Sequence, residues 1–99
     1  MIEIKNPKFP LGQVVMTCGV SGAQDASPEF AEFVAKSIQR HTQGDWGDLD
    51  EDDRRLNDAA LKSGSDRLFS AYEEGSHPKI WIITEWDRSV TTILFPDDY

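Results

Sequence analysis

Apolar residues follow a helical spacing over residues 28–43 and an alternating, strand-like spacing over three later segments. The helical stripe consists of large apolar side chains, namely Phe30, Phe33, Val34 and Ile38. Ser27 suits the N-cap of this helix, Pro28 suits its first position and Gly44 is a plausible stop. His41 lies close to the stripe near the helix C-terminus, where a cation would interact favourably with the helix dipole.

A second helix is predicted from about Glu51 to Lys62, with Asp50 as its N-cap and a stop at residues 63–65. Acidic and basic residues stand four apart along it and support the helix weakly: Asp50 with Arg54, Glu51 with Arg55, Asp58 with Lys62. Its apolar face is thin, because it has only Leu56, Ala59 and Ala60. We therefore expect this helix to lie on the surface of the core.

The remaining segments read as strands and turns. Residues 13–18 are β-branched and apolar and predict a strand, whereas residues 19–26 are small and polar and predict a turn. Three strands are predicted after the second helix, at residues 67–73, 79–85 and 90–95. The middle one is apolar on both faces, which indicates a central strand covered on each side, with Trp81 in the core.

The order β-α-α-β-β-β is typical of the α+β class, with two helices packed on one face of a small antiparallel sheet. Residues 1–10 contain Pro7 and Pro10 and predict an extended lead-in, followed by a single domain over residues 11–99. An unpaired edge strand, either 13–18 or 90–95, would offer a route to a homodimer.

The net charge of the chain limits the classes of partner that it can bind. Eighteen acidic residues oppose ten basic ones, and the net charge of −8 repels nucleic acid and anionic membranes. It favours a basic protein surface as the partner, or simply high solubility. One cysteine excludes an intrachain disulfide, the N-terminus lacks the apolar core of a signal peptide, and no apolar run reaches about 20 residues. We therefore expect a cytoplasmic protein without a membrane span.

The segment Gly44–Asp53 combines a tryptophan between two glycines with a run of carboxylates. Carboxylates belong in the first turn of a helix, but this segment has more of them than capping needs. Spaced along a helix and the loop before it, they could imitate a phosphate backbone. The candidate partner-binding residues are Asp45, Trp46, Asp48, Asp50, Glu51, Asp52 and Asp53. Alternatively, Trp46 packs in the core between the helices, and Gly44 and Gly47 permit the turn.

Other chemistries find little support. Asp48, Asp50 and Asp52 resemble the start of an EF-hand loop, but Asp53 stands where glycine is needed and Ala59 where a bidentate glutamate is needed. The sequence has no zinc-ligand spacing, glycine-rich phosphate loop or nucleophile elbow. We therefore predict no metal, no cofactor and no catalytic residue.

Cys18 would need a base to act as a nucleophile, and nothing in the sequence brings His41 or His77 to it. A buried structural thiol is the better interpretation of this cysteine. Asn57 is interpreted as a buried amide that ties down the Trp46 loop by bonding to backbone groups.

Three stretches resemble a family of small, uncharacterised bacterial proteins that are labelled plasmid-related. They are Leu11–Val15, the run from His41 through Leu49 to Asn57, and the run from Trp81 to Tyr99. The resemblance covers nearly the whole chain from Leu11 onward, and it departs from the family at Trp86, where a small residue such as alanine is expected. It implies a bacterial cytoplasmic accessory protein carried on mobile DNA, and it assigns no catalytic residue.

Two hypotheses of function follow. The first is a non-enzymatic binding module. Mobile elements carry small acidic inhibitors that occupy the basic DNA channel of a restriction or CRISPR nuclease, and this protein would be one of them. The second is a small-ligand-binding or hydrolytic domain, whose polar site would gather near Trp46, Asn57, Thr84, Glu85 and Arg88. A concave site at these residues would favour the second hypothesis over the first.

Overall fold

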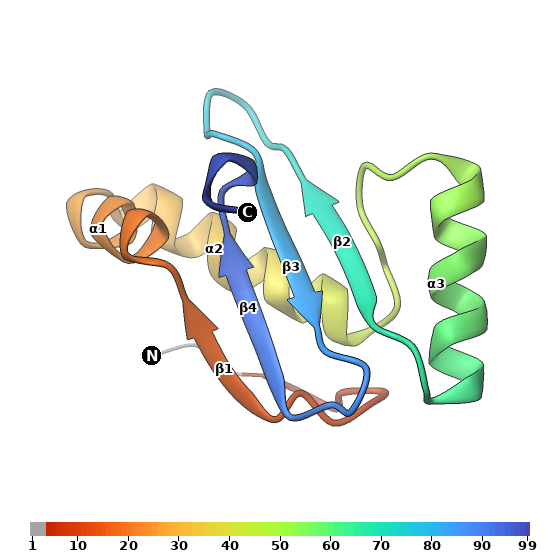
Figure 1. The fold of residues 1–99 in the computed structure, drawn as a ribbon. Helices are drawn as coiled ribbons and strands as arrows, with labels where there is room; N and C mark the ends of the chain where they lie inside the picture. Colours follow the sequence, from red (N-terminus) through yellow and green to blue (C-terminus); the bar gives the residue numbers. More distant parts are fainter. Residues whose placement is uncertain (1–3) are drawn as a thin grey trace.

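The computed structural model describes residues 4–99 as a two-layer α+β domain with a four-stranded sheet (Figure 1). The elements in chain order are β1 (Gln13–Met16), α1 (Cys18–Ala26), α2 (Pro28–Thr42), α3 (Glu51–Ser63), β2 (Leu68–Tyr72), β3 (Ile80–Thr84), β4 (Val90–Leu94) and the 3₁₀ turn η1 (Pro96–Asp98). The predicted α+β class is confirmed. None of the helices within residues 4–99 has the length and apolar character that a membrane crossing requires.

The sheet is mixed and has the strand order β1-β4-β3-β2. β2, β3 and β4 form an antiparallel meander, whereas β1 pairs with β4 in parallel. The prediction of a purely antiparallel sheet was therefore wrong for β1. The reason is connectivity, because the helices that follow β1 carry the chain across the sheet before the meander begins. Of the two candidate edge strands, β4 lies between β1 and β3, so only β1 is an edge strand.

The predicted turn at residues 19–26 is a helix, so the domain has three α-helices and not two. The Thr17 side chain accepts a hydrogen bond from the Val20 amide and caps α1, and Cys18 is the exposed first residue of the helix, not a buried strand residue. Gly19 fits here for packing reasons, because a Cβ would lie 3.3 Å from the Phe95 ring. Small residues that indicate a turn in sequence instead allow α1 to pack closely.

α1 and α2 cover one face of the sheet, and α3 lies beside its β2 edge (Figure 1). The main core joins Val20 of α1 and the apolar stripe of α2 to the strand side chains Tyr72, Ile80, Ile82 and Ile93. Ser27 caps α2, Asp50 caps α3, and Gly64 ends α3 in a left-handed conformation, as their sequence positions predict. A second core cluster forms near α3 from Phe9, Leu11, Trp46, Ala60 and Leu68.

Among residues 4–99, no α-helix lies over the opposite face of the sheet (Figure 1). β3 is central, as predicted, and it has some cover on this face as well, because Tyr99 packs on Trp81 and Ile83 is only 4% exposed. Trp81 points to this face and is half-buried, so it lies outside the main core, contrary to its predicted placement. It packs instead edge-to-face on Phe69, with ring centroids 5.1 Å apart.

The lead-in predicted over residues 1–10 is docked on the domain where the structure describes it, and residues 1–3 lie outside the described range. Phe9 is buried, and the Lys8 amide donates to the Thr42 carbonyl at the end of α2. Gln39 exchanges two hydrogen bonds with the backbone of Lys5. Residues 4–10 thus belong to the folded unit that begins before Leu11.

Candidate functional site

The loop between α2 and α3 pairs with the outer edge of β2. The Asp48 amide donates to the Ala71 carbonyl over 2.7 Å, and the Ala71 amide donates to the Trp46 carbonyl over 3.3 Å. The Asp48 carboxylate then accepts from the Glu73 amide over 2.8 Å. An edge strand normally presents such groups to solvent or to another chain, and here the loop satisfies them.

Gly47 is required at this contact. Its φ is +75°, and a Cβ built on it would lie 2.0 Å from the Ala71 carbonyl oxygen. Gly44 has a similar φ of +77° but ample space, since the nearest atom to its Cβ would be 3.7 Å away. The two glycines around Trp46 thus serve different purposes, close approach at one and backbone conformation at the other.

Asn57 completes the protection of the β2 edge from α3. It is 5% exposed, its side-chain NH₂ donates to the Phe69 carbonyl, and its side-chain oxygen accepts from the Phe69 amide over 3.0 Å. The amide group mimics a neighbouring strand, because it supplies one donor and one acceptor side by side. Asn57 is a buried amide that bonds to backbone groups, as expected, but these groups belong to Phe69 of β2 and not to the Trp46 loop.

Trp46 is only 4% exposed and lies in the second core cluster. Its indole N–H donates to the Asp58 carboxylate over 2.9 Å, which satisfies the one polar group of the side chain. The core interpretation of Trp46 is thereby confirmed. In this conformation Trp46 has little surface to offer a partner.

The candidate carboxylates are exposed, and most of them have a local structural partner. Asp45 forms a two-bond ion pair with Arg40, which holds the pKa of the Asp45 carboxyl below its usual range. Glu51 pairs with Arg55 over 2.8 Å. Asp50 accepts from the Asp53 amide as the N-cap of α3. The other two predicted pairs along α3 form no ion pair within 4.0 Å.

Asp52 and Asp53 are exposed, and their carboxylates have no hydrogen-bond or ion-pair partner among residues 4–99. Asp48 and Asp50 bond to backbone amides and form no ion pair within 4.0 Å among residues 4–99. Residues 48–58 hold six carboxylates and two guanidinium groups. Their net charge of −4 is half of the net charge of the whole chain, concentrated in eleven residues.

His41 is fully buried at the end of α2, so it is not the exposed cation that its position suggested. Its Nδ1 lies 2.6 Å from Ser70 Oγ and its Nε2 lies 2.9 Å from Thr84 Oγ1. Thr84 bonds to Thr91 over 2.8 Å, and Thr91 donates to the Leu11 carbonyl. Since Thr91 has one proton and gives it to Leu11, Thr84 must donate to Thr91 and accept from Nε2–H. The chain of bonds therefore assigns the proton of neutral His41 to Nε2.

Burial lowers the pKa of His41 to about 3, and the nearby Arg88 guanidinium acts in the same direction. The Phe9 and Trp46 rings flank the imidazole edge-on, with centroids 5.5 and 5.6 Å away. Ser70 donates to Nδ1, an arrangement that resembles a nucleophile with its base. Both groups are fully buried, however, and the bonds hold three strands to α2.

This network was missed in the sequence. Its signal was the placement of hydroxyl residues at core-facing positions of three strands, where apolar residues are the rule.

The residues of the alternative ligand site do not converge on a cavity. Arg88 has a left-handed φ of +60°, and its guanidinium donates to the carbonyls of Ala60, Asp66 and Glu85. It thereby ties the β3–β4 turn to the end of α3, where a cation is favourable. Two surface depressions, of about 490 and 430 Å³, are open to solvent and lined by other residues.

No group of three histidine, cysteine, aspartate or glutamate side chains within residues 4–99 is arranged to hold a metal ion. Fold and site together define a small acidic α+β protein, with one sheet edge covered by its own loop and one sheet face without an α-helix among residues 4–99. No protein-family model, curated protein or solved structure matches this chain.

Proposed function

We propose that this protein is a non-enzymatic binding module that presents the acidic start of α3 to a basic protein surface. The observation that carries the proposal is the row of exposed carboxylates at residues 48–53, of which Asp52 and Asp53 have no structural partner among residues 4–99. A field of one sign speeds the encounter with a partner of opposite charge and selects against others.

The geometry favours binding over catalysis. The buried pair of His41 and Ser70 has no access to substrate, and Asn57 and Arg88 are engaged with backbone groups. Trp46 is buried in the core next to the acidic loop, so it offers no exposed side chain to a partner. We therefore assign partner contact to Asp48, Asp50, Glu51, Asp52 and Asp53, with Asp45 at the margin because it is paired with Arg40.

The partner that fits best is a protein whose own ligand is nucleic acid, since its binding channel is basic and shaped for a row of phosphates. The resemblance to plasmid-related proteins of mobile DNA supports a defence nuclease, of the restriction or CRISPR type, in the bacterial cytoplasm. In this proposal the protein acts as an inhibitor that competes with DNA, and it binds neither DNA nor membrane itself.

Cleavage of a short DNA duplex by purified restriction and CRISPR nucleases, with increasing amounts of this protein, tests the proposal. We expect competitive inhibition of at least one such nuclease that weakens steeply as salt is raised. Asp52→Asn with Asp53→Asn should reduce the inhibition by about tenfold, a loss of about 1.4 kcal/mol.

The matched control is Asp25→Asn with Glu32→Gln, which removes the same charge from exposed positions on α1 and α2. Equal loss of inhibition in both double variants would show that net charge alone is responsible. Absence of inhibition of every nuclease tested would reject the DNA-competitor role.

A further inference from the structure

The sheet face without a helix is apolar where a solvent-facing sheet is expected to be polar. Alternation along β2, β3 and β4 places Phe69, Ala71, Trp81, Ile83, Val90, Thr92 and Leu94 on the side away from α1 and α2. Only Thr92 among these is polar. Ala71, Ile83 and Leu94 are buried by their neighbours, and the other four residues are half-buried, so they provide the accessible part of this surface. An antiparallel sheet with one face in water normally alternates apolar-in with polar-out. We call this surface the open face.

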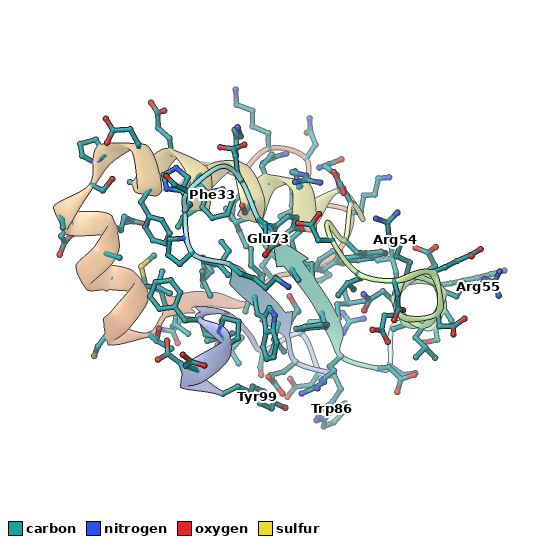
Figure 2. All side chains as sticks on the ribbon, turned by 90° about the horizontal axis from the view of Figure 1, so that it is seen from above. Phe33, Arg54, Arg55, Glu73, Trp86 and Tyr99 are labelled. Atoms are coloured by element: carbon teal, nitrogen blue, oxygen red, sulfur yellow. The ribbon has the colours of Figure 1, made fainter. Side chains whose placement is uncertain are left out.

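Aromatic side chains extend the open face outward. Tyr99 packs edge-to-face on Trp81 with ring centroids 5.9 Å apart and is itself 70% exposed. Trp86, at the β3–β4 turn, is 63% exposed. Figure 2 shows Tyr99 and Trp86 on the side of the molecule opposite Phe33, which lies on α2. Large exposed aromatics around a patch of this kind are typical of an interface.

Two complementary charges flank the aromatic residues without pairing with each other. Arg67 and Glu85 stand one residue beyond the Leu68–Thr84 pair, on neighbouring strands and at the same end of the open face. The Arg67 guanidinium donates to the Tyr99 hydroxyl over 2.9 Å, and neither charge has an ion-pair partner within 4.0 Å among residues 4–99. At the other end of the same strands, Glu73 and Lys79 are only loosely paired at 3.9 Å.

We infer that the open face binds the open face of a second copy of this chain. A twofold axis parallel to the strands and between β2 and β3 exchanges the positions of the two strands across the interface. Arg67 then faces Glu85 of the other copy, and Glu73 faces Lys79, at both symmetry-related positions. The aromatic cluster of Phe69, Trp81 and Tyr99 lies between these charges, so it loses contact with water.

The interface is small, because it is confined to two strands and the residues after β4. Stable dimers bury about 800 Å² per partner, and several residues of the open face are already buried within one copy. Two copies with a charge of −8 also repel each other at low salt. We therefore expect a weak dimer that forms at high protein concentration and moderate ionic strength.

Sedimentation velocity from micromolar to millimolar protein, in about 0.15 M salt, tests this inference. We expect a concentration-dependent shift from monomer to dimer. Arg67→Glu and Glu85→Arg should each weaken the self-association by about tenfold or more, because each places like charges at both symmetry-related contacts. An equimolar mixture of the two variants should form a heterodimer, since both contacts are then complementary again.

Glu32→Arg and Lys36→Glu are the matched controls, because they reverse charge on α2, on the other side of the sheet. They should leave the dimer unchanged. Circular dichroism checks that every variant is folded. A chain that stays monomeric at millimolar concentration would overturn the inference, as would a dimer indifferent to Arg67→Glu, or a mixture that fails to associate. These results are independent of any nuclease inhibition.

Discussion

At the scale of single residues, Gly47 and His41 show how position decides the role of a side chain. Gly47 leaves no room for a Cβ beside the β2 backbone, whereas Gly44, three residues earlier, does. His41 lies near the C-terminus of a helix, where a cation would be favourable, yet desolvation keeps it neutral. In both cases a neighbour distant in sequence sets the constraint.

Gly47→Ala should destabilise the protein far more than Gly44→Ala. Both substitutions place alanine at positive φ, which costs about 1–2 kcal/mol. Only Gly47→Ala also forces the loop away from β2, and this adds about 2 kcal/mol or more from lost edge bonds. Urea unfolding of the two variants measures the difference, and equal stability would mean that the loop is not packed on the strand.

The stability of the protein should fall as the pH is lowered from about 6.5 to 3 because of His41. The pKa is about 6.5 in the unfolded chain and about 3 in the folded protein, so the unfolded state takes up the proton first. The slope is at most about 1.4 kcal/mol per pH unit in this window.

The unfolding free energy at pH 7 and pH 5 checks this expectation. His41→Gln should flatten the dependence, although it lowers stability at pH 7 by disturbing the bonds to Ser70 and Thr84. His77→Gln, in the β2–β3 turn, is the control and should retain the slope that His41 causes.

At the scale of elements, the loop before α3 and the α3 helix act together as a substitute for a fifth strand. The loop backbone forms hydrogen bonds with the backbone amide and carbonyl of Ala71, and the Asn57 side chain does the same for Phe69. The β2 edge is therefore protected from pairing with another chain. The segment Gly44–Asn57 is therefore first of all a structural device. Its carboxylates are available for binding because this device holds them at the surface.

Asn57→Ala should cost about 2–4 kcal/mol, because it leaves a buried donor and a buried acceptor of Phe69 unpaired. Faster hydrogen exchange of the Phe69 amide should accompany the loss. Asp58→Asn, which keeps an acceptor for the Trp46 indole, is the neighbouring control and should change stability by less than about 1 kcal/mol. An unchanged exchange rate in Asn57→Ala would contradict the edge-protection role.

At the scale of the whole molecule, the asymmetry between the two faces of the sheet controls the surroundings of the three tryptophans. Trp46 is buried behind the acidic loop, Trp81 is half-buried on the open face, and Trp86 is exposed at a turn. The charge of the molecule is asymmetric as well, since half of its net charge lies in residues 48–58. These two asymmetries underlie our two proposals, a basic partner at the acidic segment and a second copy on the open face.

Acrylamide quenching of fluorescence should follow this order of exposure. Trp86→Phe should remove the most accessible component of the emission, and Trp46→Phe the least accessible one. With dimerisation, quenching of the remaining Trp81 component should fall as protein concentration rises. Equal accessibility of all three tryptophans would contradict the two-faced arrangement.

The amino-acid sequence by itself determined α2, α3 and the three strands of the meander to within a few residues. The signals were local, namely caps, periodicity and turn residues, because these depend only on neighbours along the chain. It also determined the acidic character, because charge is additive over residues. It left Trp46 open between a core side chain and an exposed anchor, and the tertiary structure decided for the core.

Only the tertiary structure decided the rest. α1 forms from small residues because they fit against Phe95 and α2, and β1 joins β4 in parallel because of the path of the intervening helices. Trp81 faces the side of the sheet that has no α-helix among residues 4–99, where it packs on Phe69 and Tyr99. The hydrogen bonds that protect the β2 edge join residues far apart in the sequence, and so do those of the His41 network. No local sequence pattern therefore predicts them. Buried backbone and side-chain polar groups need hydrogen-bond partners, and those partners can lie far away in the sequence. Only the folded chain brings them together.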